Sequence, residues 1–186
     1  MRILIILLIL ALIGSCTNEI SDIKKITSQT NTKVEIAETI EMLYSDSAQV
    51  RVRILAPILK RYDTREEAYE EFPEGLRVEF LNKNKNVSSW LEADYAIKKE
   101  NDSKIYVEQN VVLYNTRDEK LFTDELIWDE KNEEVYTNKA IKIVQPALGD
   151  TSFGFGFKAD QEFTRFEISN KFSAIKNMTD FSESFK

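Results

Sequence analysis

Apolar residues alternate with polar ones along much of the chain, most regularly between residues 105 and 143. Short runs rich in Val, Ile, Tyr, Phe and Trp are separated there by charged turns at 116–120 and 131–134. β-Branched and aromatic residues favour strands, and a period of two places them on one face of a sheet. The pattern therefore predicts antiparallel strands joined by hairpins.

The parity of this alternation slips within the middle strand of the stretch. Leu121 and Thr123 would lie on one face of a regular strand, whereas Leu126 and Trp128 would lie on the other. A β-bulge adds one residue to a strand and changes the face to which the following side chains point. We therefore expect a bulge or a sharp twist between Thr123 and Leu126.

Residues 34–44 also alternate, but a helix is an alternative because Ile36, Ile40 and Leu43 fit one helical face. Their β-branched residues favour the strand.

Residues 62–71 are charged and predict a connector or a single helical turn. Further strands are expected at 50–54, ending near Pro57, at 76–80, at 87–97 and at 163–168. In residues 153–157 Phe alternates with Gly, which predicts that all three Phe side chains share one face.

The chain begins with Met1-Arg2 and an apolar run from Ile3 to Gly14. As a helix this run would be about 18 Å long, too short for a hydrocarbon core of about 30 Å. Ile13-Gly14-Ser15-Cys16 resembles the lipobox of bacterial lipoproteins, in which the Cys is lipidated. We therefore predict a signal peptide at 1–15, lipidation at Cys16 and a flexible tether at 16–33. An ordinary signal peptide or a buried thiol is the alternative.

Composition excludes several functional classes. The 186 residues carry a net charge of −7, which argues against nucleic acid as a partner because phosphate binding needs a basic face. The chain has no His and one Cys, so a Ser-His-Asp triad, a His-ligated zinc site and an internal disulfide are excluded. Adjacent acids such as Asp129 and Glu130 would point to opposite faces of a strand and would not converge on a substrate. We predict no catalytic residue, metal or cofactor.

Several segments together carry a resemblance to a known family. They are Phe72-Pro-Glu-Gly-Leu-Arg-Val-Glu-Phe, Ala93-Asp-Tyr-Ala96, Asn110-Val-Val-Leu-Tyr-Asn, Leu121-Phe-Thr-Asp-Glu-Leu-Ile-Trp-Asp, Val135-Tyr-Thr and Gly154-Phe-Gly-Phe-Lys-Ala-Asp-Gln-Glu-Phe. In this order and spacing, from about Tyr44 to Ile168, the chain resembles LptC, the periplasmic component of lipopolysaccharide export. The resemblance implies an all-β fold at 34–169, an open antiparallel β-jelly roll in the form of a twisted, V-shaped sandwich of two sheets. Residues 170–186 would form a C-terminal tail.

The resemblance also implies a role without catalysis. Such a protein receives lipopolysaccharide from the permeases of an inner-membrane ABC transporter and passes it to a periplasmic bridge protein of similar jelly-roll fold. Many family members have one transmembrane helix, whereas this chain is predicted to carry a lipid anchor at Cys16. The family favours the inner membrane for that anchor, facing the periplasm.

The alternation and the resemblance together select candidate site residues. The lipid-binding side chains expected to point inward are Val107, Val111, Leu113, Leu126, Trp128, Ile141, Ile143 and Phe155. The edge expected to bind a partner carries Phe163, Phe166 and Ile168. Periodicity alone favours a tightly packed sandwich with no cavity, and the resemblance reverses that preference. Two alternatives stay open: a carrier of another lipid or of lipoproteins, and a surface β-sandwich lipoprotein that only binds protein.

Overall fold

The structure is a computed structural model, and it describes residues 33–63, 68–99 and 102–171. The chain divides into two units after Lys33, and the side chains discussed below all belong to the second, Val34–Lys186. The predicted signal peptide at 1–15, Cys16 and the tether up to residue 32 lie outside the described residues. So does the segment 172–186 of the predicted tail.

The described residues fold almost entirely into antiparallel strands, so the predicted all-β fold is confirmed. The first strand occupies the segment for which a helix was the alternative. The strands are β1 (Lys33–Asp46), β2 (Gln49–Asp63), β3 (Ala68–Phe72), β4 (Leu76–Leu81), β5 (Val87–Ala93), β6 (Tyr95–Lys99), β7 (Lys104–Asn115), β8 (Lys120–Asp129), β9 (Glu134–Gln145), β10 (Asp150–Asp160) and β11 (Phe166–Lys171), and the 3₁₀ helix η1 spans Pro146–Leu148.

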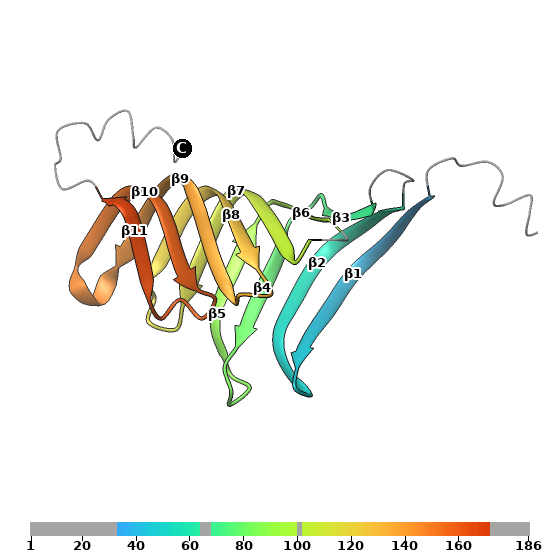
Figure 1. Ribbon diagram of the computed structural model, residues 1–186, viewed down its shortest axis with the longest axis horizontal. Coiled ribbons are helices and arrows are strands. Elements are labelled where there is room, and N and C mark those ends of the chain that lie inside the picture. Colours follow the sequence, from blue (N-terminus) through green and yellow to red (C-terminus); the bar gives the residue numbers. More distant parts are fainter. Residues whose placement is uncertain (1–32, 64–67, 100–101, 172–186) are drawn as a thin grey trace, which may run out of the picture. The chain divides into compact units, whose positions relative to one another are not determined.

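The eleven described strands form one sheet with the order β11-β10-β9-β8-β7-β5-β4-β2-β3-β6, in which β1 pairs with β2 and β6 also pairs with β7. Figure 1 shows β11 to β7 side by side, with the β1–β2 hairpin at the opposite edge. Between β2 and β7 the sheet therefore divides into two branches. One branch is the β4–β5 pair and the other is the β3–β6 pair.

This division explains why the strand around Pro57 was predicted too short. β2 pairs with β4 through residues 52–55 and with β3 through residues 60–63. Pro57 lies between these two ladders, so the N–H that proline lacks is not missed in either of them. The strand continues through Pro57 to Asp63, and the prediction that it stops near Pro57 is wrong.

The charged segment 62–71 was predicted as a connector but contains the end of β2 and most of β3. Charged side chains form pairs across the β2–β3 ladder. Arg61 of β2, for example, binds Glu70 of β3, with 2.6 Å between its Nη2 atom and the Oε1 atom of Glu70. The Tyr62 and Tyr69 rings stack with centroids 4.5 Å apart. Such pairs stabilise a strand whose sequence has little hydrophobic alternation. The single strand expected at 87–97 is likewise two strands, β5 and β6, which separate at Asp94.

The three ladders that join β7, β8, β9 and β10 each carry a register shift, and we call these shifts the bulge line. The shifts lie between Glu108 and Val111 in β7, between Thr123 and Ile127 in β8, and between Phe155 and Phe157 in β10 where it pairs with β9. The irregularity predicted between Thr123 and Leu126 from the slip in parity is confirmed. Bulges bend a strand and increase its twist, so this line is where the sheet curves.

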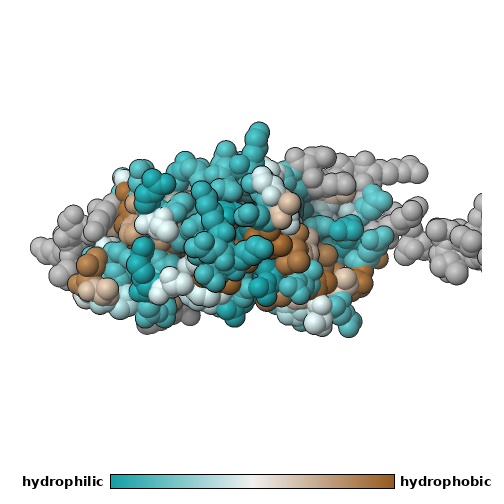
Figure 2. Space-filling model, turned by 90° about the horizontal axis from the view of Figure 1, so that it is seen from below, coloured by the Kyte–Doolittle hydropathy of each residue, from teal (hydrophilic) through white to brown (hydrophobic). Residues whose placement is uncertain are grey.

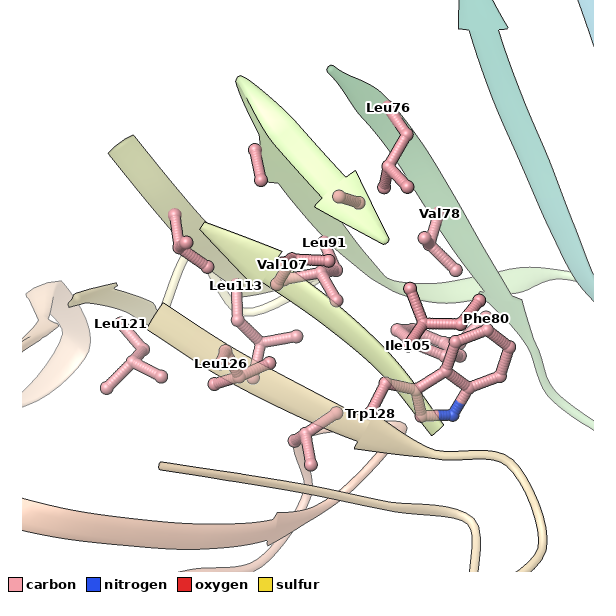
Figure 3. Close-up of a cluster of buried hydrophobic side chains, with 14 of the residues drawn as sticks. Leu76, Val78, Phe80, Leu91, Ile105, Val107, Leu113, Leu121, Leu126 and Trp128 are labelled. Carbon is pink, nitrogen blue, oxygen red and sulfur yellow. The ribbon is translucent and has the colours of Figure 1, made fainter. Parts of the chain in front are cut away.

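The curved sheet packs one face against itself and gives a jelly-roll-like sandwich. Trp128 of β8 meets Phe80 of β4 with ring centroids 5.2 Å apart, although β8 and β4 are not neighbours in the sheet. Figure 3 shows these two side chains together with Ile105 at one end of the buried cluster. Leu113, Leu121 and Leu126 extend the cluster along β7 and β8, so the core lies between the two inner faces.

Candidate functional site

Seven of the eight side chains predicted to line the interior are buried together. Their exposed fractions are all 0% or 1%, and they belong to one apolar cluster contributed by β7, β8 and β9. The members are Val107, Val111, Leu113, Leu126, Trp128, Ile141 and Ile143. Alternation within each strand therefore gave their inward orientation correctly, and their contact with lipid remains a prediction.

The inward orientation expected for Phe155 is wrong. Phe155 is 42% exposed, whereas Phe157, two residues later, is buried. Gly156 between them has φ +74°, and the register with β9 shifts at this point. The bulge changes the parity of β10, so Phe155 points to the outer face and Phe157 packs in the core.

Two of the three residues predicted at the partner edge lie on a terminal strand, and binding of a partner there stays a prediction. β11 is a terminal strand of the sheet and carries Phe166 and Ile168, which pack against the core. Phe163 is instead fully buried in the loop before β11, with φ +50°, and is not part of the edge. β11 also continues to Lys171, two residues into the segment predicted as a tail.

The central side chains of the core are fully buried, and two cavities among the described residues adjoin β1. The first cavity has a volume of about 480 Å³ and lies among β1, β2, β3 and β6. Its wall includes Met42, Tyr44, Arg61, Tyr62, Tyr69 and Lys98. Figure 2 shows hydrophobic residues reaching the surface toward this end of the view, between hydrophilic ones.

The second cavity has a volume of about 430 Å³ and lies among the β1–β2 turn, the end of β8 and the β10–β11 loop. Its wall includes Tyr44, Asp46, Arg51, Trp128, Glu130 and Gln161. Trp128 is the only one of the eight predicted lipid-binding residues that lines either of these two cavities. Tyr44 lines both cavities.

Tyr44 is held in this place by contacts on two sides. Its ring meets the Trp128 indole edge-on, with centroids 6.1 Å apart. Lys98 donates a hydrogen bond to the Tyr44 hydroxyl at 3.1 Å, and its ammonium lies 4.9 Å from the ring centroid. The same ammonium binds a carboxylate oxygen of Glu130 at 2.6 Å. We call Tyr44, Lys98 and Glu130 the latch cluster.

Partial burial affects the protonation of this cluster. Burial is the largest influence on Tyr44 and raises its pKa, although Lys98 acts in the opposite direction, so the phenol is neutral at physiological pH. Burial alone would lower the pKa of Lys98, but its hydrogen bonds to Glu130 and Tyr44 outweigh that effect and raise it. Lys98 is therefore a charged ammonium that is largely removed from water and satisfied by two partners.

A polar cluster fixes the opposite end of β7. Asn115 donates to Glu119 at 2.7 Å and to the main-chain oxygen of Phe163 at 2.8 Å. Arg117 and Gln145 also donate to the Glu119 carboxylate. Burial would raise the pKa of Glu119, but these donors outweigh it and hold the pKa below its ordinary value. The cluster therefore ties the loop that contains Phe163 to the β7–β8 turn.

The adjacent acids Asp129 and Glu130 have separate hydrogen-bond partners. Asp129 accepts hydrogen bonds from the main chain and side chain of Asn132, at 3.0 and 2.9 Å, and so closes the β8–β9 turn. Glu130 binds Lys98 in the latch cluster. Among the described residues, no group of three His, Cys, Asp or Glu side chains is arranged to hold a metal ion.

Sequence reasoning did not find the latch cluster or Gln161. The three latch residues are contributed by β1, β6 and the residue after β8, and their meeting depends on the tertiary fold. The sequence does contain one signal: Lys98 ends an apolar alternation, which places a cation next to a buried face.

Comparison with known protein families identifies the family to which this chain belongs. The family model described as "Lipopolysaccharide-assembly, LptC-related" matches residues 3–176, nearly the whole chain. The chain belongs to the LptC-related family. Its role is therefore in lipopolysaccharide transport, and the family consists of transport proteins that are not known as enzymes. Comparison with curated proteins finds no match.

LptC-related proteins act in the periplasm and the cell envelope, together with other components of lipopolysaccharide transport. No helix within residues 33–63, 68–99 and 102–171 is long and apolar enough to cross a membrane. The jelly-roll-like sandwich with its apolar interior is the fold that the sequence resemblance implied.

Proposed function

We propose that this LptC-related protein transfers lipopolysaccharide without catalysis, from the permeases of an inner-membrane ABC transporter to a periplasmic bridge protein of similar jelly-roll fold. The observation that carries the proposal is the apolar interior, enclosed by one curved sheet with two terminal strands: β11, which pairs only with β10, and β1, which pairs only with β2 among the described strands. A lipid can enter at one end of such a sheet and leave at the other.

Acyl chains are the part of the lipid that this interior suits. Each Å² of apolar surface removed from water stabilises a complex by about 25 cal/mol, so burial alone supplies substantial affinity. The net charge of −7 works against attraction of anionic headgroups. The cavity of about 480 Å³ lies within the usual range for small-ligand sites.

The terminal strands supply the proposed partner contacts. An exposed strand edge offers unpaired N–H and C=O groups, and a partner can add its own strand there. β11, which carries Phe166 and Ile168, is proposed to receive the bridge protein. The transporter is proposed to contact the opposite end, where β1 pairs only with β2 among the described strands.

Cys16 is proposed to hold the protein at the inner membrane through attached lipid. One acyl chain binds a membrane only marginally, so stable attachment requires more than one. Labelled fatty acid should enter the wild-type protein and not the Cys16→Ser variant. A free thiol at Cys16 in the mature protein would overturn this part of the proposal.

Photo-crosslinking in cells tests transfer directly. A photoreactive residue at Val111 or Leu113, both buried on β7, should capture lipopolysaccharide. Val112 provides a matched control, because it lies between them on the same strand and points to the outer face. Glu119, in the β7–β8 turn, is a second control. Capture at Val112 and Glu119 equal to that at Val111 would show that the interior is not the lipid path.

The complete burial of the central core residues favours a second candidate, a β-sandwich lipoprotein that only binds protein. In that case the probe at Val111 should capture no lipid, whereas a probe on β11 should still capture a protein. Capture of a different lipid at Val111 would instead support a carrier of another lipid or of lipoproteins.

A further inference from the structure

The two cavities on the β1 side share one wall residue, Tyr44. We propose that Tyr44 is a gate between them, kept closed by the Lys98–Glu130 ion pair, and that its release joins the two cavities into one path for an acyl chain. This inference rests on the proposed lipid transfer, because it identifies the residue that controls entry to the same interior.

The contacts of the Tyr44 ring explain why moving it would open the interior. Trp128 is 1% exposed, and its indole has two edge-on aromatic partners, Tyr44 and Phe80. Phe80 is fully buried on β4, whereas Tyr44 is half-buried on the terminal strand β1. Displacing Tyr44 would therefore expose one edge of the indole, and an acyl chain could replace the ring there.

The strand that carries Tyr44 lies at an edge of the sheet, and Ile40, Met42 and Tyr44 are its side chains that pack against the core. Among the described strands β1 pairs with β2 alone, and its side chains Val34, Ile36 and Leu43 are exposed. Thr39 interrupts the strand with φ +53°, an uncommon conformation for a β-branched residue. A strand with few buried apolar contacts opens at lower free energy than the core of a fold.

The latch cluster opposes that opening. Lys98 lies on β6 and Glu130 follows β8, so their ion pair joins two parts of the sandwich, and the hydrogen bond to Tyr44 adds β1. Lys98 and Glu130 are only 16% and 20% exposed in their side chains, so the pair is partly shielded from water and salt. Removing either charge leaves Tyr44 without the ordered ammonium that holds its hydroxyl.

Quenching of Trp128 fluorescence tests the gate in the absence of lipopolysaccharide. The full-length chain with Trp90→Phe, reconstituted in phosphatidylcholine vesicles, has Trp128 as its single Trp. Acrylamide should quench this indole weakly in the parent and at least twofold more strongly after Lys98→Met or Glu130→Gln. Lys158→Met is the matched control, because Lys158 forms an exposed ion pair with Glu134 at 2.9 Å and lines neither cavity.

Melting temperatures of the variants distinguish opening of the gate from unfolding of the domain. Tyr44→Phe retains the ring and removes the hydroxyl that Lys98 binds, so it should raise quenching with a melting temperature close to that of the parent. Unchanged quenching in Tyr44→Phe and in whichever ion-pair variants stay folded would overturn the gate. Increased quenching that appears only together with loss of the cooperative melting transition would also overturn it.

Lipid capture separates the gate from the proposed function. With the photoreactive residue at Val111, Lys98→Met should increase lipopolysaccharide capture relative to Lys158→Met. Absence of capture in every variant, together with increased quenching, would reject lipid transfer but leave the gate as a property of the fold. Normal capture with unchanged quenching would reject the gate and retain the transfer function.

Discussion

Trp128 donates a hydrogen bond from Nε1 to Oε1 of Gln161 at 3.2 Å, across 33 positions of sequence. The main-chain oxygen of Gln161 in turn accepts a hydrogen bond from Ser89 at 2.5 Å, across 72 positions. Gln161 is 4% exposed. One residue in the β10–β11 loop therefore joins β8 and β5, and it holds the C-terminal edge of the sheet in place.

Gln161→Leu should destabilise the protein. It leaves the buried indole N–H of Trp128 without its partner, and an unsatisfied buried donor costs about 1–3 kcal/mol. Chemical denaturation measures the change in the free energy of unfolding. Gln49→Leu, the same substitution at an exposed position on β2, is the control and should change it by less than about 0.5 kcal/mol. Equal effects of the two substitutions would show that the hydrogen bond contributes nothing.

Gly154→Ala should loosen β11 from the sheet. A Cβ at Gly154 would lie 2.6 Å from the main-chain oxygen of Asn170 and 2.6 Å from Cγ2 of Ile168, so the edge strand would have to shift. The melting temperature and amide exchange of β11 report this change. Gly149→Ala is the control, because nothing lies within 4 Å of its added Cβ and only its positive φ strains it. Unchanged exchange in β11 after Gly154→Ala would contradict the close approach.

Stability should fall in acid because of Glu119 and Asp129. Burial alone would raise the pKa of both carboxyl groups. Hydrogen bonds from Asn115, Gln145 and Arg117 instead hold the pKa of Glu119 below its ordinary 4.5. Hydrogen bonds from Asn132 hold the pKa of Asp129 below its ordinary 3.8. A lowered folded-state pKa contributes stability that is present above the unfolded value and lost as pH falls through the folded one.

Denaturation between pH 7 and pH 3 measures this loss. Glu119→Gln should lower stability at pH 7 and flatten the decline below about pH 4.5. Glu74→Gln, at an exposed position, is the control and should leave the profile nearly unchanged. A decline just as steep in Glu119→Gln as in the wild type would show that this carboxyl does not contribute.

Glu167→Pro should weaken binding of the bridge protein at least tenfold while leaving the domain folded. Glu167 is exposed on the terminal strand β11, and proline cannot donate a ladder hydrogen bond. A pull-down with the bridge protein measures binding, and circular dichroism measures folding. Glu167→Ala retains the N–H and should bind normally. Unchanged affinity of Glu167→Pro would place the docking edge elsewhere.

The local parts of the fold could be predicted from the sequence. Strict alternation gave the inward residues of β7 to β9, and the slip between Thr123 and Leu126 gave the bulge. The orientation of Phe155 could not be predicted, because the bulge at Gly156 matches an irregularity of the neighbouring strand β9. The strand through Pro57 depends on where β2 changes partner from β4 to β3.

The candidate site was predictable only in its apolar part. Periodicity identifies which side chains face inward, but polar contacts such as Lys98–Glu130 and Trp128–Gln161 join segments whose distance in the sequence has no periodic signal. The charged residues of β3 predicted a connector, but the segment is a strand. Its charge at Glu70 is accommodated there because it pairs with Arg61 across the ladder. Contacts between distant segments of the folded chain determine the partners of these side chains.

The bulge line has a consequence for how the protein fluctuates. Ladder pairs are interrupted at neighbouring positions in β7, β8, β9 and β10, so the inter-strand hydrogen bonds fall into two groups on either side. Each group can then open as a separate cooperative unit, with its own protection against solvent exchange. The domain would behave as two coupled halves, and a lipid bound across the line would make them fluctuate as one.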